Sequence, residues 1–241
     1  MLTEMAPTDP VDVLDMLFAE EREAEGRPWV MLNMVTSIDG ATALRGGATA
    51  LNDPDDKMLF LSLRSVADVV MVGAETVRAE ALGPINMTAE MTKRREEAGF
   101  DGPPRMAILT RSGNIDPGHR VFSDQSNPPV VLTSGSDGSE LDGLREVAEV
   151  VQVPVLDGPG IVQAFRGVGV VLCEGGPTVN SQLVAGDLVD EINLTISPLF
   201  ALGPSKRVAV APDELDPPIE MRLDRVMRGT RSLFARFVRN E

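Results

Sequence analysis

The sequence predicts an α/β protein with a mostly parallel central sheet and helices on both of its faces. Short apolar runs rich in Val, Ile and Leu alternate along the chain with amphipathic segments of helical length. Two of these runs end in glycine and lead directly into a helix start, at Gly73 and at Gly175–Gly176. Near the end of the chain, the turn 228–230 joins two strand-like segments, which is typical of an antiparallel hairpin.

Length and composition favour a single domain. A chain of 241 residues with 43% hydrophobic residues can bury one large core. No segment has the composition of a linker, and no period of repeat length recurs. We therefore expect residues 1–241 to form one domain, in which residues 1–26 are a loose tail and a helix.

Charge and residue counts exclude several kinds of partner. The formal net charge of −15 argues against binding to nucleic acid or to an anionic membrane. Cys173 is the single cysteine, so an internal disulfide and a thiol-rich metal site are both excluded, and we expect no metal. Since no window resembles a signal peptide or a transmembrane run, the sequence predicts a soluble, cytoplasmic protein.

In the first half of the chain, helix starts and short apolar runs alternate. An Asp followed by Pro begins a helix twice, because Asp caps free N–H groups and Pro fits the first turn. Apolar runs too short for helices of their own are assigned to strands. The expected elements are a helix at 9–25, a strand at 29–35, a helix from 53, a strand at 68–72, a charged helix at 87–98, and strands at 106–109 and 130–132.

The second half continues this alternation up to the final hairpin. The run 168–172 has the β-branched content of a strand buried on both faces, so we place it at the centre of the sheet. Residues 188–196 alternate apolar and polar side chains, which also indicates a strand. The expected elements are a helix at 141–148, a strand at 150–153, a helix from about 157, the strand at 168–172, a helix from 177, a strand at 188–196, and hairpin strands at 221–226 and 232–238.

The junction after the central strand is the strongest candidate for a ligand site. Glu174, Gly175–Gly176 and Pro177 follow the strand and open the next helix. A diglycine turn lets backbone approach a ligand closely, and a helix N-terminus favours phosphate. The alternative is a tight turn in which Glu174 only caps a neighbour.

Polar residues after the first strand form a second group of candidates. Asn33 interrupts an apolar strand, so its amide either bonds neighbouring backbone or faces a ligand. Ser37 and Asp39 follow in a polar turn, and Thr49 lies in the glycine-rich loop behind it.

Hydroxyl groups and one arginine stand at three further strand ends. Thr76 follows the second strand and either bonds phosphate or ribose or caps its own helix. Thr110, Arg111 and Ser134 end two other strands and could together hold a phosphomonoester. The alternative for these residues is an ordinary surface turn.

Several enzyme classes are excluded by missing motifs. No G-x-G-x-x-G follows a strand, and the chain has no G-x-x-x-x-G-K-[ST] phosphate loop and no G-x-S-x-G elbow. The chain contains no tyrosine, which excludes reductases that use a Tyr/Lys proton donor.

Three blocks of sequence together resemble the pyrimidine reductase domain of riboflavin biosynthesis, which has the dihydrofolate reductase-like fold. The first is P-W-V-M-L-N-M-V-T-S-I-D-G at residues 28–40, and the second is L-R at 63–64 followed by D-V-V-M-V-G-A-E-T-V at 68–77. The third runs from L-C-E-G-G-P at 172–177 to L-V-D-E at 188–191, with Ser197–Pro198 and Gly203 closing it. The resemblance spans about residues 27–240 and implies a three-layer fold with a C-terminal antiparallel hairpin.

This resemblance implies NADPH-dependent reduction of 5-amino-6-(5-phosphoribosylamino)uracil to its ribitylamino form, by a homodimer. The residues carried over as cofactor contacts are Gly73, Thr76, Val77, Thr110, Arg111, Ser134, Gly175, Gly176, Pro177 and Thr178. Those carried over to the substrate side are Asn33, Ser37, Asp39, Thr49, Glu174 and Gly203. Asp39 and Glu174 are the expected catalytic residues, because a carboxyl whose pKa is raised in an apolar pocket can donate a proton. The alternative for both is purely structural hydrogen bonding.

Three departures from the family pattern fall on the substrate side. Bacterial members often carry Lys where Asn33 stands, and their acidic pair appears here as the segment 80–84. Their usual Trp is replaced around Ala50–Leu51. The chain also lacks the His-x-Glu and Pro-Cys-x-x-Cys zinc signature of the deaminase half, so we expect reduction without deamination. The alternatives are a related reductase of a pterin-like or dihydrofolate-like substrate, and a non-catalytic nucleotide-binding homologue.

Overall fold

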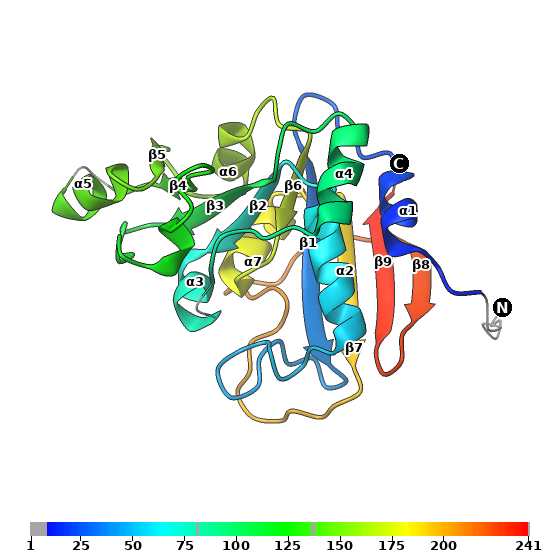
Figure 1. Cartoon of the computed structure of the whole chain (residues 1–241). Helices are drawn as coiled ribbons and strands as arrows, with labels where there is room; N and C mark the ends of the chain where they lie inside the picture. The colour runs from blue at the N-terminus through cyan, green and yellow to red at the C-terminus, as the bar shows by residue number, and fades with distance from the viewer. Residues whose placement is uncertain (1–8, 81, 136–137, 241) are drawn as a thin grey trace.

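The computed structural model describes residues 9–80, 82–135 and 138–240 and contains one nine-stranded sheet (Figure 1). The strand order is β5-β4-β3-β2-β6-β1-β7-β9-β8, and the strands from β5 to β7 are parallel. β9 is antiparallel to β7 and to β8. The strands are β1 Trp29–Ser37, β2 Val69–Gly73, β3 Arg105–Thr110, β4 Val130–Thr133, β5 Glu149–Gln152, β6 Val170–Cys173, β7 Glu191–Ser197, β8 Met221–Arg228 and β9 Leu233–Arg239.

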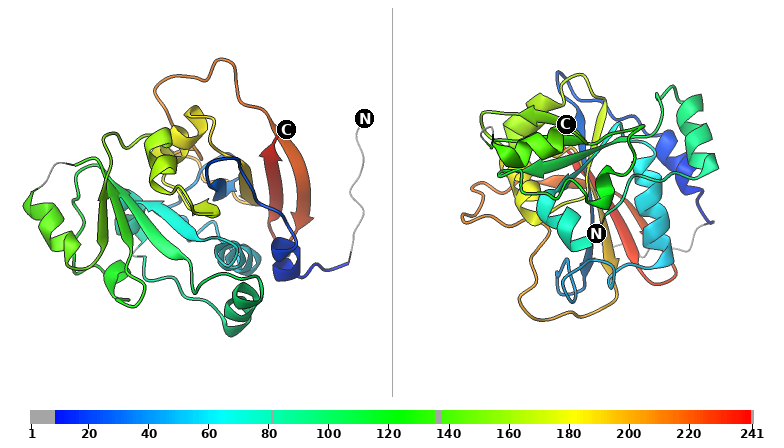
Figure 2. Two further views of the ribbon diagram at one scale, coloured as in Figure 1. Left: turned by 90° about the horizontal axis from the view of Figure 1, so that it is seen from above. Right: turned by 60° about the vertical axis from the view of Figure 1, so that its left-hand side comes forward.

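Helices cover both faces of this sheet. Seen from above in Figure 2, α6 and α7 lie on one face, and α1, α2 and α4 lie on the other. The helices are α1 Val13–Phe18, α2 Pro54–Arg64, α3 Ala74–Glu80, α4 Ala89–Glu97, α5 Ser139–Arg145, α6 Gly158–Ala164 and α7 Pro177–Ala185, with a 3₁₀ turn at Arg120–Phe122. The predicted parallel sheet, its two helical layers and the C-terminal antiparallel hairpin are therefore confirmed.

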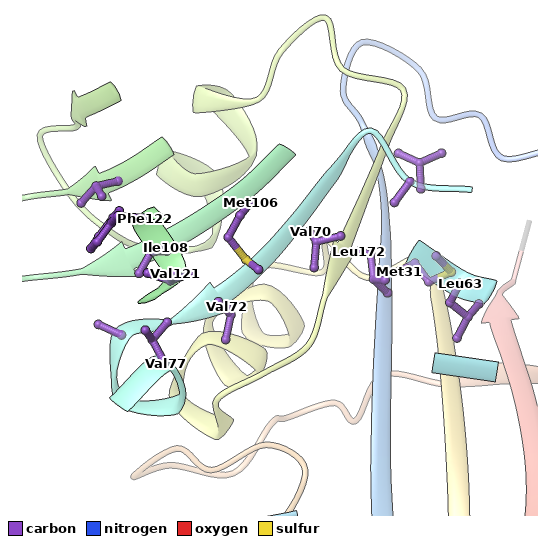
Figure 3. Close-up of a cluster of buried hydrophobic side chains, with 14 of the residues drawn as sticks. Met31, Leu63, Val70, Val72, Val77, Met106, Ile108, Val121, Phe122 and Leu172 are labelled. Carbon is purple, nitrogen blue, oxygen red and sulfur yellow. The ribbon is translucent and has the colours of Figure 1, made fainter. Parts of the chain in front are cut away.

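The sheet separates two hydrophobic cores. Val70 and Val72 of β2 point into the core under α2, whereas Val69 and Met71 point into the core under α6 and α7, because successive side chains of a strand alternate between faces. Figure 3 shows the first of these cores. Burial on both faces explains why β2 and β6 read as uninterrupted apolar runs.

The first helix is much shorter than the predicted helix at 9–25. Asp12 caps α1, because its carboxylate accepts hydrogen bonds from the backbone N–H groups of Leu14 (2.9 Å) and Asp15 (3.0 Å). α1 then ends at Phe18, and beyond it the side chain of Arg22 pairs with Glu191 of β7 at 3.1 Å. The glutamates at 20–25 suggested a solvated helical face, but tertiary ion pairing draws this segment onto the sheet.

The topology brings two glycine turns to the same sheet edge. β6 lies between β2 and β1, so the carboxyl ends of these three strands are neighbours. The other boundaries agree with the sequence to within a few residues, and β6 lies at the middle of the sheet as predicted. Across the described ranges of the chain, no helix is both long and apolar enough to cross a bilayer.

Candidate active site

The turns after β2 and β6 are in direct contact. The backbone N–H of Gly73 donates a hydrogen bond to the carbonyl oxygen of Gly175 at 2.9 Å. A Cβ on Gly73 would lie 3.5 Å from the backbone nitrogen of Gly176, and a Cβ on Gly176 would lie 3.3 Å from the Oγ1 atom of Thr76. Gly175 has a φ of +98° and its peptide bond to Gly176 is cis. The predicted cofactor residues Gly73, Thr76, Gly175 and Gly176 therefore form one compact group.

Helix α7 begins in this group with its first turn uncapped. Gly176 occupies the N-cap position and has no side chain to accept a hydrogen bond, and Pro177 is the first helical residue. Thr178 follows and is exposed. The free N–H groups of such a helix start carry partial positive charge and suit an anionic group such as a pyrophosphate.

Val77 is placed differently from the other predicted cofactor residues. Its side chain is fully buried and packs in the core under α2, where Figure 3 shows it near Val121. The side chain of Val77 is therefore not available to a cofactor, and a contact through its backbone stays a prediction. Its β-branched side chain fills the interior, so only its backbone remains available to a ligand.

Thr110, Arg111 and Ser134 continue the same sheet edge on the far side of β2. β3 and β4 follow β2 in the sheet, and Thr110 pairs in register with Thr133. The hydroxyl of Thr110 is buried and accepts a hydrogen bond from the N–H of Gly113 at 3.1 Å. Arg111 is exposed, and its guanidinium makes no hydrogen bond or ion pair to any residue in the described part of the chain. Arg111 is therefore free to bind an anion, while Thr110 also holds its own turn.

Glu174 is directed toward α2 by Arg64. The Nε and Nη2 atoms of Arg64 donate to the two carboxylate oxygens of Glu174 at 2.6 and 2.7 Å, in a bidentate pair. Both side chains are at most 9% exposed. Arg64 also stacks on Phe60, with its guanidinium carbon 4.2 Å from the ring centre. Arg64 belongs to the second family block, but its sequence gives no sign of a site residue because its partner lies 110 positions away.

Asn33 lies beside Glu174 at the end of β6. In the parallel register Leu32 faces Cys173, so Asn33 and Glu174 are the next residues on the two strands. On the other side Asn33 faces Asn193 of β7. The Asn33 side chain is 9% exposed and makes no hydrogen bond to the residues that the structure describes. Of the two interpretations of this amide, a side chain available to a ligand is the one consistent with the geometry.

Asp39 connects the loops that follow β1 and β7. Its carboxylate accepts hydrogen bonds from the Ser37 hydroxyl at 2.5 Å and from the backbone N–H groups of Ala201 (3.0 Å) and Leu202 (2.8 Å). The Ser37 hydrogen bond, followed by the two backbone bonds, lowers the pKa of Asp39 to about 2. The expected raised pKa is therefore wrong for Asp39, because hydrogen bonds to its charged form outweigh the small desolvation of an exposed group. Its observed contacts order the loop before Gly203.

Thr49 lies in a loop that Glu80 attaches to α3. The Glu80 carboxylate accepts from the backbone N–H of Ala48 at 2.8 Å and from the Thr49 hydroxyl at 3.5 Å. The same loop reaches the segment after β7, where the N–H of Thr42 donates to the carbonyl of Lys206 at 3.1 Å. Glu80, which the sequence showed only as a departure from the family pattern, thus anchors the loop that carries Thr49.

Two further observations concern other kinds of site. Within residues 9–80, 82–135 and 138–240, no three His, Cys, Asp or Glu side chains are grouped as a metal site requires. A cavity of about 250 Å³ lies between Asp187, Met221 and Arg239, which is at the opposite edge of the sheet, where β7 starts. The candidate site described above is therefore the group formed by the glycine turns, Glu174 and Asn33.

Comparison with known proteins assigns this arrangement to a family. A model of the RibD C-terminal domain matches residues 28–233, which include both glycine turns, Arg64 and Glu174. The chain belongs to the RibD C-terminal domain family. A relative in Methanothermobacter thermautotrophicus, 2,5-diamino-6-ribosylamino-4(3H)-pyrimidinone 5′-phosphate reductase, is 27% identical over 194 residues, covering 79% of this chain and 87% of that protein.

Solved structures agree with membership of the RibD C-terminal domain family. A pyrimidine reductase-like protein from Corynebacterium diphtheriae is 25% identical and superposes with a TM-score of 0.83, covering 96% of this chain and 100% of the other. Dihydrofolate reductase from Enterococcus faecalis, solved with NADP(H), is 11% identical, with a TM-score of 0.55 over 88% of this chain and 97% of the other. This likeness concerns the fold alone. The predicted dihydrofolate reductase-like fold is thus confirmed.

Proposed function

We propose that this protein is an NADPH-dependent reductase of riboflavin biosynthesis that converts a ribosylamino-pyrimidine 5′-phosphate into its ribitylamino form. The observation that carries this proposal is the family match over residues 28–233, which contains the two touching glycine turns and Glu174. The Methanothermobacter relative, matched along 87% of its length, is named for a reduction of this type.

The glycine turns fit the phosphates of a dinucleotide. Gly73 and Gly176 leave no side chain between the two turns, and the uncapped start of α7 offers backbone N–H groups to an anion. Arg111, with Ser134 nearby at the same sheet edge, supports a preference for NADPH over NADH, because a free guanidinium binds a 2′-phosphate by charge-assisted hydrogen bonds. The bound cofactor supplies a hydride to C1′ of the sugar.

The substrate lies, in this proposal, on the side of α2 and β1. Glu174 and Asn33 are adjacent there and present hydrogen-bonding groups to the pyrimidine or to the ribose hydroxyls. Ser37, Thr49 and Gly203 belong to the loops around this side, and Asp39 orders those loops in its charged form. Reduction at C1′ breaks the bond to the ring oxygen, which must then take up a proton. Since Asp39 has a pKa of about 2, it carries no proton for this step at neutral pH.

Two pyrimidines are candidate substrates, and they differ at ring position 2. The family resemblance implies the uracil form, 5-amino-6-(5-phosphoribosylamino)uracil, whereas the Methanothermobacter relative is named for the 2,5-diamino form. We favour the diamino form, because relatives in Archaeoglobus fulgidus and Aquifex aeolicus, matched along 83% and 80% of their lengths, are named for the same diamino substrate.

Turnover of the purified protein tests the proposal. NADPH oxidation is followed with each pyrimidine, with NADH in place of NADPH, and with dihydrofolate as an unrelated substrate. We expect turnover with the ribosylamino-pyrimidines, formation of the ribitylamino product by mass spectrometry, and no turnover with dihydrofolate. NADPH binding without turnover of either pyrimidine would contradict the reductase and favour a nucleotide-binding protein.

We also propose that the protein acts as a homodimer in the cytoplasm, with no nucleic acid or membrane partner. Phe234 packs against the core under α2, so Leu233 and Phe237 point to the opposite face of β9. Figure 2 shows that no helix within the described ranges covers β8 and β9 on that face. Leu223 of β8 is 52% exposed and Leu233 is 37% exposed. A second copy would cover this apolar strip. Light scattering should give twice the monomer mass, and Leu223→Glu should reduce it to that of a monomer.

A further inference from the structure

We propose that Arg64 is the positioning residue that fixes the direction of the Glu174 carboxylate toward the pyrimidine substrate. This inference rests on the proposed function, since it requires Glu174 to contact substrate. Arg64 was not among the site residues expected from the sequence. Its contact with Glu174 also limits which chemical groups of a substrate Glu174 can bind.

The Arg64–Glu174 pair has the geometry of a fixed contact. Two parallel N–H groups of the guanidinium meet two carboxylate oxygens at 2.6 and 2.7 Å, which sets the plane of the carboxylate as well as its distance. The side chains of Arg64 and Glu174 are 9% and 6% exposed, so water competes little for these bonds. A bidentate pair restricts the rotation of Glu174 in a way that a single point charge does not.

Arg64 is itself held from one helical turn away. Phe60 precedes it by four residues on α2, and the guanidinium stacks 4.2 Å from the centre of its ring. Arg64 is the last residue of α2, and Glu174 is the first residue after β6. The packing of α2 therefore fixes where the Glu174 carboxylate lies at the end of β6.

This arrangement determines what Glu174 can bind. Both of its oxygens already accept hydrogen bonds from Arg64, and each oxygen keeps a second lone pair. Glu174 is thus presented as an acceptor, and its ligand must offer N–H or O–H donors. A ring N–H, an exocyclic amine or a ribose hydroxyl meets this requirement, and a phosphate does not.

A double-mutant cycle tests the proposal. Arg64→Met and Glu174→Gln each remove a charge-assisted contact, so we expect each to lower kcat/KM about 10- to 100-fold, mainly through KM for the pyrimidine. Because Arg64 acts through Glu174, the double variant should lose no more than either single variant. Losses that multiply in the double variant would overturn the proposal, as would an Arg64→Met variant with the kcat/KM of the wild type.

The conservative variant and a matched pair separate positioning from a general effect of charge. Arg64→Lys keeps the positive charge but not the fork, so we expect it to remain at least tenfold impaired. Full activity in Arg64→Lys would overturn the proposal. Arg105 and Glu149 form an exposed arginine–glutamate pair with a single contact of 2.6 Å between β3 and β5, away from the site, and Arg105→Met with Glu149→Gln should leave kcat/KM unchanged. NADPH affinity should be unchanged in all of these variants.

A second measurement, made on the wild-type protein alone, is independent of catalysis and of variant folding. The Nε–H proton of Arg64 should give a slowly exchanging NMR signal, because Glu174 accepts its hydrogen bond where little water reaches it. Absence of that signal in the wild type would overturn the proposal even if the enzyme is active. A wild-type enzyme that shows the signal but reduces neither pyrimidine would instead refute the proposed function, so the two failures are distinguishable.

Discussion

Two buried arginine–glutamate groups lie on the same face of the sheet, and their surroundings differ. Glu174 has one cationic partner, Arg64, and stands beside Asn33 and the glycine turns. Glu191 is fully buried at the start of β7. It accepts from Arg22 at 3.1 Å and from Arg236 at 2.9 Å, with further bonds from the Asn193 amide and the Trp29 indole. Glu191 therefore has no accessible surface left for a ligand.

The comparison shows that residue type and motif membership do not determine role. Glu174 and Glu191 both belong to the third family block of the sequence. Burial alone would raise the pKa of Glu191, but the hydrogen bond from Arg236 and the charges of Arg22 and Arg236 lower it to about 2. That network joins the segment after α1 to β7 and β9. We infer that Glu191 stabilises the fold and that Glu174 serves the site.

The largest expected effect is a loss of cofactor binding in a variant that still folds. Gly176→Val places a branched side chain 3.3 Å from Thr76 Oγ1, where the cofactor phosphates are proposed to lie. We expect NADPH binding to be lost in a fluorescence titration, with only a small change in Tm. Gly118→Val is the control, since its Cβ meets only the side chain of Asp116 at 3.2 Å in a surface turn. Normal NADPH binding by Gly176→Val would show that the turn is only structural.

A substitution at Glu191 should have the opposite effect, lowering stability while leaving cofactor binding and turnover unchanged. Glu191→Gln removes one carboxylate that Arg22 and Arg236 both contact, although both keep Glu20 and Arg236 keeps Asp224. We therefore expect the free energy of unfolding to fall by about 3 kcal/mol in urea titrations. NADPH affinity and kcat/KM of the folded fraction should be unchanged. Equal stability of Glu191→Gln and wild type, or a selective loss of turnover, would contradict the distinction between the two groups.

Lowering the pH should remove the stability that Glu191 contributes. The folded pKa of Glu191, about 2, lies below the ordinary value of 4.5, so its contribution to stability is present above pH 4.5 and is lost as pH falls toward 2. The difference in unfolding free energy between wild type and Glu191→Gln should therefore shrink by roughly 3 kcal/mol across that range. A difference that is constant from pH 6 to about pH 2 would assign the stabilisation to another group.

The smallest predicted effect concerns the outer part of the cofactor side. Arg111 is exposed and unpaired among the described residues, so Arg111→Ala should leave Tm unchanged. Loss of a charge-assisted bond to a 2′-phosphate should weaken NADPH about tenfold and NADH hardly at all. The control is Arg105→Ala, at the opposite end of β3. Equal losses for both cofactors in Arg111→Ala would remove the 2′-phosphate assignment.

Local signals in the sequence predicted most of the fold. Asp53 caps α2 by accepting from the N–H of Asp56 at 2.9 Å, as the Asp–Pro signal indicated. The glycine turns follow β2 and β6 where expected, because capping and turn formation depend on neighbouring residues. The helix predicted at 9–25 is shorter because Arg22 and its neighbours gain ion pairs with distant strands.

The sequence by itself determined the strands, most of the helix starts and the glycine turns of the site, since each depends on contacts between residues close in the chain. Only the tertiary structure decided the partners of the carboxylates. Arg64 and Glu174 are 110 positions apart, and Asp39 and Ala201 are 162 apart. Such pairings set whether a carboxyl group is charged, where it points and what it can still bind. They arise only when the sheet order brings α2 over β6 and the loop after β7 beside the loop after β1, because a side chain's partner depends on distance in space.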